Sequence, residues 1–228
     1  MSEETVELGL ERLLDGAREY AYAGRANSME RCLANARAYA TEFTERTDPL
    51  YFSFLGKLED VRTYGRERAQ ERYRLTALAH AFKGNIQGTR ACLDLWEELN
   101  TQTPSGFKDY VLSVAYKCRA VSHLCAALER AKSGDIHGTR SCLKKAHHSE
   151  TRANTCLPRA LYTNMIRIAY STRAERLLDL AVVHAANKDW RKANGYYGAA
   201  IKCANTVNYA LPEPALEQLA DCKARSQL

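Results

Sequence analysis

The ten residues GNIQGTRACL at positions 84–93 return, almost unchanged, as GDIHGTRSCL at positions 134–143. Extending the comparison to residues 77–93 and 127–143 gives ten identical residues in seventeen aligned positions. A catalytic motif normally occurs once for each active site, whereas a stretch that returns along the chain is typical of proteins built from repeated structural units. The repetition therefore predicts architecture rather than chemistry.

Two looser copies extend the repeat over most of the chain. Residues 21–33 contain a glycine and end in the same Cys-Leu pair, and residues 185–203 have Asn187 and Asp189 at the turn. The alanines that anchor the four copies are 60, 50 and 54 residues apart: Ala21, Ala81, Ala131 and Ala185. We predict a single domain of four units and a terminal helix, with these bounds: 4–47, 48–103, 104–150, 151–211 and 212–228.

Each copy has the features of two helices joined by a very short turn. An alanine-rich segment ends at Gly84 or Gly134, and glycine readily adopts the left-handed conformation that ends many helices. Asn85 or Asp135 follows directly, as Asp189 does in the fourth copy, and these residue types are preferred N-caps. We therefore predict one helical hairpin for each unit.

Further local signals predict where the helices begin and what they bury. Asn27 and Glu30 have the spacing of a capping box, and Asp48 predicts the start of a long helix in which Gly65 is a candidate kink. After residue 107, apolar residues three and four apart predict one buried stripe. Its members are Val111, Val114, Cys118, Val121, Cys125 and Leu128.

These signals predict an all-α fold in which about four tandem helical hairpins stack as a short α-solenoid. A last helix, beginning near Pro214, is expected to cap the open end of the array, because terminal repeats need a polar outer face. Alternating polar and β-branched runs, which would predict strands, do not occur in the sequence.

The hairpin turns resemble the middle of a tetratricopeptide-type repeat. The residues that carry the resemblance are Ala81, Gly84, Asn85, Ile86, Cys92 and Leu93, then Ala131, Gly134, Asp135, Ile136, Cys142 and Leu143, and more weakly Ala185, Asp189, Trp190 and Ala193. The period of 50–60 residues exceeds the period of about 34 in that family. The resemblance therefore covers the turns and implies tandem helical hairpins. Residues 17–40 are also similar to helical-repeat chains of archaeal type, which implies no function.

The sequence has no pattern typical of a metal site, a cofactor site or a catalytic centre. Eight cysteines and six histidines are present, but none of them forms the closely spaced pairs that structural zinc requires. Cys32, Cys92 and Cys142 occupy equivalent positions in the copies, which favours a packing role. We predict no catalytic residue, no metal and no cofactor.

Two repeated features have more than one reading. Gly88 and Gly138 lie in the first turn of the second helix, where backbone N–H groups can bind a phosphate. Because both occupy the same register, we favour close approach of a neighbouring helix. Arg90 and Arg140 recur too, and the sequence leaves open whether they face a partner or a neighbouring helix.

Charge is distributed unevenly along the chain, whose net charge is +6. Residues 1–100 hold 14 basic and 17 acidic residues, a net charge of −3, whereas residues 101–228 hold 19 and 10, a net charge of +9. The arginines, lysines and tyrosines of the basic half are suited to an acidic protein or to the phosphates and bases of a nucleic acid. The candidate partner-binding residues are Arg140, Lys144, Lys145, Arg152, Arg159, Tyr162, Arg167, Tyr170 and Arg173.

The sequence therefore predicts a non-enzymatic binding or scaffold protein that recognises a protein or peptide. One alternative is a nucleic-acid-binding module that uses the basic half. Another is self-assembly into a homo-oligomer, in which the acidic part of one copy meets the basic part of the next. The N-terminus lacks the features of a signal peptide and no run of about 20 apolar residues occurs, so we expect a cytoplasmic protein without a membrane partner.

Overall fold

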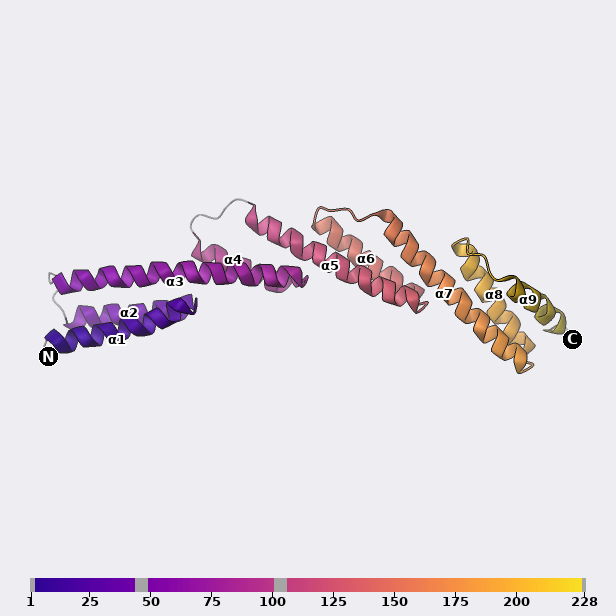
Figure 1. The fold of residues 1–228 in the computed structure, drawn as a ribbon, viewed down its shortest axis with the longest axis horizontal. Helices are drawn as coiled ribbons and strands as arrows, with labels where there is room; N and C mark the ends of the chain where they lie inside the picture. Colours follow the sequence, from indigo (N-terminus) through magenta and orange to yellow (C-terminus); the bar gives the residue numbers. More distant parts are fainter. Residues whose placement is uncertain (1–2, 44–48, 101–105, 227–228) are drawn as a thin grey trace. The chain divides into compact units, whose positions relative to one another are not determined.

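The computed structural model describes residues 3–43, 49–100 and 106–226. Within these ranges the chain is all-helical, with 87% helix and no strand, and its helices pack in adjacent pairs (Figure 1). The predicted all-α class is confirmed. The described helices are α1 (Glu3–Tyr22), α2 (Ala26–Phe43), α3 (Pro49–Phe82), α4 (Ile86–Leu99), α5 (Phe107–Lys132), α6 (Ile136–Arg152), α7 (Arg159–Ala186), α8 (Trp190–Thr206) and α9 (Glu213–Ser226). The predicted cap at Asp48 lies outside the described residues.

The chain divides into two compact units, Met1–Ala115 and Tyr116–Leu228, and the division falls within α5. In the first unit, the α1–α2 hairpin packs on the first half of α3 around Leu14, Leu33 and Leu58. The second half of α3 packs with α4 and the start of α5. Helix α3 is therefore shared by two successive layers, as its course in Figure 1 shows.

The second unit repeats this arrangement with other helices. The end of α5, helix α6 and the first half of α7 form one core around Leu124, Leu143 and Met165. The second half of α7 packs with α8, and α9 adds Cys222 to that core against Tyr197. The helix that begins near Pro214 is thus present and packs on α8.

The predicted joint between paired helices is confirmed in detail. Gly84 and Gly134 have φ angles of +65° and +67°, which glycine adopts without steric cost. The N–H of Asn85 donates to the carbonyl oxygen of His80 at 2.9 Å, and the N–H of Gly84 donates to that of Ala81 at 2.9 Å. This pair of hydrogen bonds satisfies carbonyls that the end of the helix would leave without partners.

In the three later hairpins the residue after the left-handed turn caps the next helix, as predicted for Asn85, Asp135 and Asp189. The side chains of Asn85 and Asp135 accept hydrogen bonds from the N–H groups of Gly88 and Gly138, at 3.1 and 2.8 Å. A Cβ atom at Gly138 would collide with the Asp135 carboxylate and with the Arg130 side chain, which lies on the preceding helix. The glycine therefore leaves room for the capping carboxylate and for the end of the Arg130 side chain.

The predicted capping box in the first hairpin is wrong. Helix α2 already begins at Ala26, and the N–H groups of Ser28 and Met29 bond to the carbonyl oxygen of Arg25 at 3.1 and 3.0 Å. Glu30 instead binds two arginines of α3. A tertiary ion pair has displaced the local cap.

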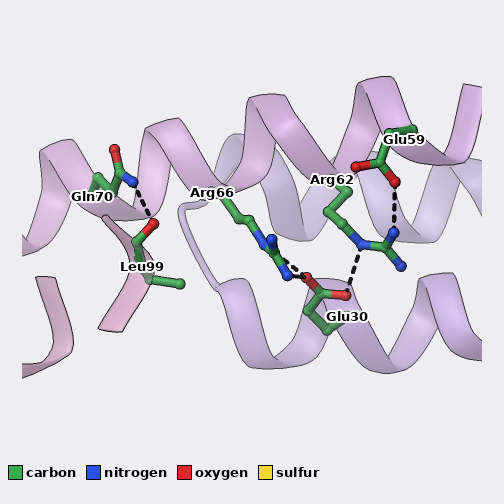
Figure 2. A network of polar contacts seen from close by, with 6 residues as sticks. All are labelled: Glu30, Glu59, Arg62, Arg66, Gln70 and Leu99. Carbon is green, nitrogen blue, oxygen red and sulfur yellow. Dashed lines mark hydrogen bonds and ion pairs between the residues drawn. The ribbon is translucent and has the colours of Figure 1, made fainter. Parts of the chain in front are cut away.

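A polar network holds α3 between its neighbours (Figure 2). The carboxylate of Glu30 on α2 accepts hydrogen bonds from Arg62 and Arg66 of α3, at 3.1 and 3.0 Å. Farther along α3, Gln70 donates to the carbonyl oxygen of Leu99 at 2.6 Å and so satisfies the end of α4. These contacts fix the register of α3 on both of its partners within the first unit.

The predicted buried stripe of α5 is confirmed at Val111 and wrong at Val121 and Cys125. Val121 is 51% exposed and Cys125 is exposed, whereas the buried residues of this helix are Val111, Ala115, Ala120, Leu124, Ala127 and Ala131. Four of these six are alanines, whose small side chains allow helices to approach closely. Gly65 of α3 also allows a close approach, because it lies against Met29 of α2. Helix α3 is not interrupted at Gly65 and continues to Phe82.

Within the described residues, α5 is long and apolar enough to cross a membrane by length and composition alone. Its Val111 and Ala115 lie in the core with α4, and its Leu124 and Ala127 lie in the core with α6. Core helices often satisfy the same criterion.

Replacing Gly134 tests the joint. The change Gly134→Ala places a Cβ atom in the left-handed region and 3.2 Å from backbone atoms of Arg173. We expect it to lower the free energy of unfolding by about 1–2 kcal/mol in urea titrations.

Gly195→Ala is the matched control, because a Cβ atom there meets nothing within 4 Å on an exposed part of α8. It should raise stability by about 0.5–1 kcal/mol, since alanine favours the helix interior. A Gly134→Ala protein as stable as the wild type would contradict the assigned geometry.

Candidate functional site

All nine candidate partner-binding residues lie in the second unit, on α6 and α7. Six of them line the side where α6 meets the first half of α7, and we call these six the α6–α7 seam. They are Arg140, Lys144, Arg159, Tyr162, Tyr170 and Arg173. The structure therefore brings together most of the residues that the sequence singled out.

The middle of the seam answers the question left open for Arg140. Its guanidinium donates a hydrogen bond to the Tyr170 hydroxyl at 2.8 Å and lies 5.6 Å from the centre of the tyrosine ring. Hydrogen bonding and the cation–π contact both hold the arginine against α7. Arg140 thus serves a neighbouring helix, although it stays exposed.

The other three predicted residues lie off the seam. Lys145 lies near His123 of α5. Burial lowers the pKa of His123, and the positive charges of Arg119 and Lys145 lower it further. Arg152 and Arg167 are exposed, and neither lines a hollow at the seam.

Most of these cations lack an acidic neighbour. In the part of the chain that the structure describes, no carboxylate lies within 4 Å of the charged groups of Lys144, Lys145, Arg152, Arg159, Arg167 or Arg173. Other cations of both units form ion pairs, among them Arg18 and Lys57 in the first unit and Arg130 and Lys192 in the second. The α6–α7 side therefore carries positive charge that the fold leaves unneutralised, and such a surface attracts anionic groups.

A hollow of about 370 Å³ lies at one end of the seam, where α6 ends and α7 begins. We call it the α6–α7 hollow. It is lined by Leu143, Lys144, His147, Glu150, Cys156, Leu157, Arg159 and Tyr162. Its walls are largely apolar, and two unpaired cations, Lys144 and Arg159, are among its lining residues.

Glu150 is a buried carboxylate that the sequence analysis did not single out. Glu150 is 3% exposed. The N–H of Leu157 donates to it at 3.0 Å, and Nδ1 of His147 lies 3.5 Å from its second oxygen. A buried carboxylate needs such partners. The available signal was that Glu150 is the single acidic residue between His137 and Arg159.

Tyr162 packs beside Glu150 under the same hollow. Its hydroxyl is buried and completes no hydrogen bond of ordinary geometry with any described residue. Burial, and secondarily the adjacent Glu150 carboxylate, raise the pKa of Tyr162. The phenol therefore remains neutral well into the alkaline range and forms a fixed, uncharged wall.

A second hollow of about 340 Å³ lies at the opposite end of the seam, around the turn between α5 and α6. It is lined by Ser133, Gly134, Asp135, Ile136, His137 and Arg173. No group of three or more histidine, cysteine, aspartate or glutamate side chains in the described ranges is placed to hold a metal ion.

Changing Tyr162 tests the buried phenol. An unfolded tyrosine ionises near pH 10, whereas the folded Tyr162 resists ionisation, so the stability contributed by the neutral phenol is present below about pH 10 and decreases above it. Tyr162→Phe should therefore unfold with a smaller alkaline loss of stability than the wild type. Near neutral pH its stability should change by no more than about 1 kcal/mol, because no hydrogen bond is lost.

Tyr197→Phe provides the comparison, because the buried Tyr197 donates a hydrogen bond to Gln218 at 2.8 Å. It should cost about 1 kcal/mol at neutral pH. Thermal unfolding at a series of pH values measures both effects, and equal neutral-pH losses in the two variants would argue against the assigned environment of Tyr162.

No protein-family model matches this chain, and no curated protein or solved structure is significantly similar to it. The tetratricopeptide resemblance of the hairpin turns therefore stays a prediction. The hypothesis for function rests on the α6–α7 seam and the α6–α7 hollow.

Proposed function

We propose that the chain is a non-enzymatic, cytoplasmic binding or scaffold protein that uses the α6–α7 seam to bind an acidic segment of a protein or peptide partner. The observation that carries the proposal is the group of exposed cations on α6 and α7 without carboxylate partners. Charge-assisted hydrogen bonds from lysine and arginine to carboxylates are stronger than neutral ones. Unpaired cations are available to form such bonds with a partner.

The proposal includes the way in which the surface is built. We propose that the hairpins stack as a short α-solenoid of tetratricopeptide type, capped by α9. The support is that equivalent joints recur: Arg72 donates to the carbonyl oxygen of Ala23 at 3.1 Å, and Arg176 donates to that of Ser133 at 2.6 Å. In both units an arginine of the following long helix thus binds the turn of the preceding hairpin. Helical arrays of this kind present extended binding surfaces.

The geometry favours an acidic protein segment over a single-stranded nucleic acid. Stacking of bases requires accessible aromatic faces. The Tyr162 side chain packs against the core under the hollow, and the Arg140 guanidinium lies over the Tyr170 ring. The two tyrosines of the seam are therefore already engaged within the fold.

Titration of labelled probes into the purified chain tests the proposed function. We use fluorescein-labelled polyglutamate and single-stranded RNA and DNA of the same formal charge, and measure fluorescence anisotropy over a series of salt concentrations. We expect polyglutamate to bind, with an affinity that decreases as salt increases. The double variant Lys144→Glu, Arg159→Glu should weaken this binding about tenfold or more, because two attractive charges become repulsive.

The matched control is Arg12→Glu, Arg31→Glu on α1 and α2, which makes the same change in net charge on exposed residues of the first unit. It should reduce binding much less. Equal losses in the two double variants would show that net charge, not the seam, attracts the probe. Tighter binding of RNA or DNA than of polyglutamate would favour the nucleic-acid alternative, and light scattering of the free chain at increasing concentration would reveal self-assembly.

A further inference from the structure

We infer that the α6–α7 hollow receives one large apolar side chain of the acidic partner, and that Lys144 and Arg159 bind carboxylates on either side of that side chain. The inference rests on the proposed function and defines the chemistry of its partner. It predicts an acidic segment interrupted by an apolar anchor, rather than an acidic segment of any sequence.

The hollow has the size and the walls for such an anchor. Its volume of about 370 Å³ lies at the lower end of the range for ligand pockets. Leu143 and Leu157 line it, and both pack on the core that joins α5, α6 and α7. Because these walls pack on the core, they keep their shape. An apolar side chain that enters the hollow therefore leaves water for an apolar surface that is already formed. Burial of a leucine-sized group in such a site is worth about ten- to a hundredfold in affinity.

The charged residues of the hollow disfavour a charged side chain inside it. The carboxylate of Glu150 accepts a hydrogen bond from the N–H of Leu157 and lies 3.5 Å from Nδ1 of His147, and its charge repels an entering aspartate or glutamate. Lys144 and Arg159 repel a lysine or an arginine in the same way. An apolar side chain meets neither repulsion, and the largely apolar walls favour it over a neutral polar side chain.

Two other hollows in the described residues do not combine these features. In the hollow between α1 and α3, both Arg18 and Lys57 are already paired with carboxylates. In the hollow beside α9, Arg225 is paired with Asp221 and lies over the ring of Trp190. Cations that are already paired are less available to a partner.

Synthetic acidic peptides that differ at one central position test the inference. The peptides consist of aspartate and glutamate around a central leucine, serine or lysine, and their affinities for the full chain are measured by fluorescence anisotropy. We expect the leucine peptide to bind about tenfold or more tightly than the serine peptide, and the lysine peptide to bind no better than the serine peptide.

A variant that fills the hollow gives a second readout. Cys156 is an exposed residue on the wall of the hollow, so Cys156→Trp should fill part of the space without removing a core side chain. We expect it to abolish the preference for leucine while leaving the affinity of the serine peptide unchanged. Cys156→Ser, which leaves the hollow open, and Cys125→Trp, at an exposed cysteine of α5, should both keep the preference.

Alkylation of the wild-type chain supplies a readout that needs no variant. The leucine peptide should slow alkylation of the Cys156 thiol and leave that of Cys125 unchanged. Equal affinities of the leucine and serine peptides for the wild type would overturn the inference while acidic binding, and with it the proposed function, persists. If none of the acidic peptides binds, the proposed function and the inference both fail.

Discussion

A left-handed residue at the turn of each hairpin sets the positions of the helices around it. At Gly134 the chain reverses within one residue, with φ +67°, and this leaves the carbonyl of Ser133 at the surface. Arg176 of α7 donates to that carbonyl at 2.6 Å, and the backbone of Arg173 passes close to Gly134. The turn therefore positions the hairpin's own second helix and also the long helix that follows.

The seam is a consequence of this register. With α7 fixed near the turn, Tyr170 lies where Arg140 of α6 can reach it, and Tyr162 lies beside Glu150 at the far end of α6. The hollow forms at that far end, where the segment after α6 leads into α7 and the N–H of Leu157 binds Glu150. Side chains distant in the sequence thus form one surface because a single turn has set their relative positions.

The sequence predicted those parts of the fold that depend on local chemistry. Glycine followed by asparagine or aspartate specifies its own hydrogen bonds, so the joints at Gly84 and Gly134 could be predicted residue by residue. The errors arose where tertiary contacts decide. Glu30 binds α3 instead of capping its own helix, and Glu150, a lone acid among cations, is buried. On α5 the buried face consists largely of alanines. The spacing of larger apolar residues instead selected Val121, which is exposed.

Two carboxylates, Glu30 of the first unit and Glu150 of the second, are used differently by the fold. In the first unit, Glu30 binds both Arg62 and Arg66, and Arg62 also pairs with Glu59, so charge contributes to the contact between helices. In the second unit, Glu150 accepts the N–H of Leu157 beneath the surface and leaves Lys144 and Arg159 without a carboxylate. An exposed acid that paired with these residues would stabilise the fold only slightly, because surface ion pairs are worth at most about 1 kcal/mol. The fold therefore gains little from neutralising the seam, and the proposed recognition of an acidic partner uses the charge that remains.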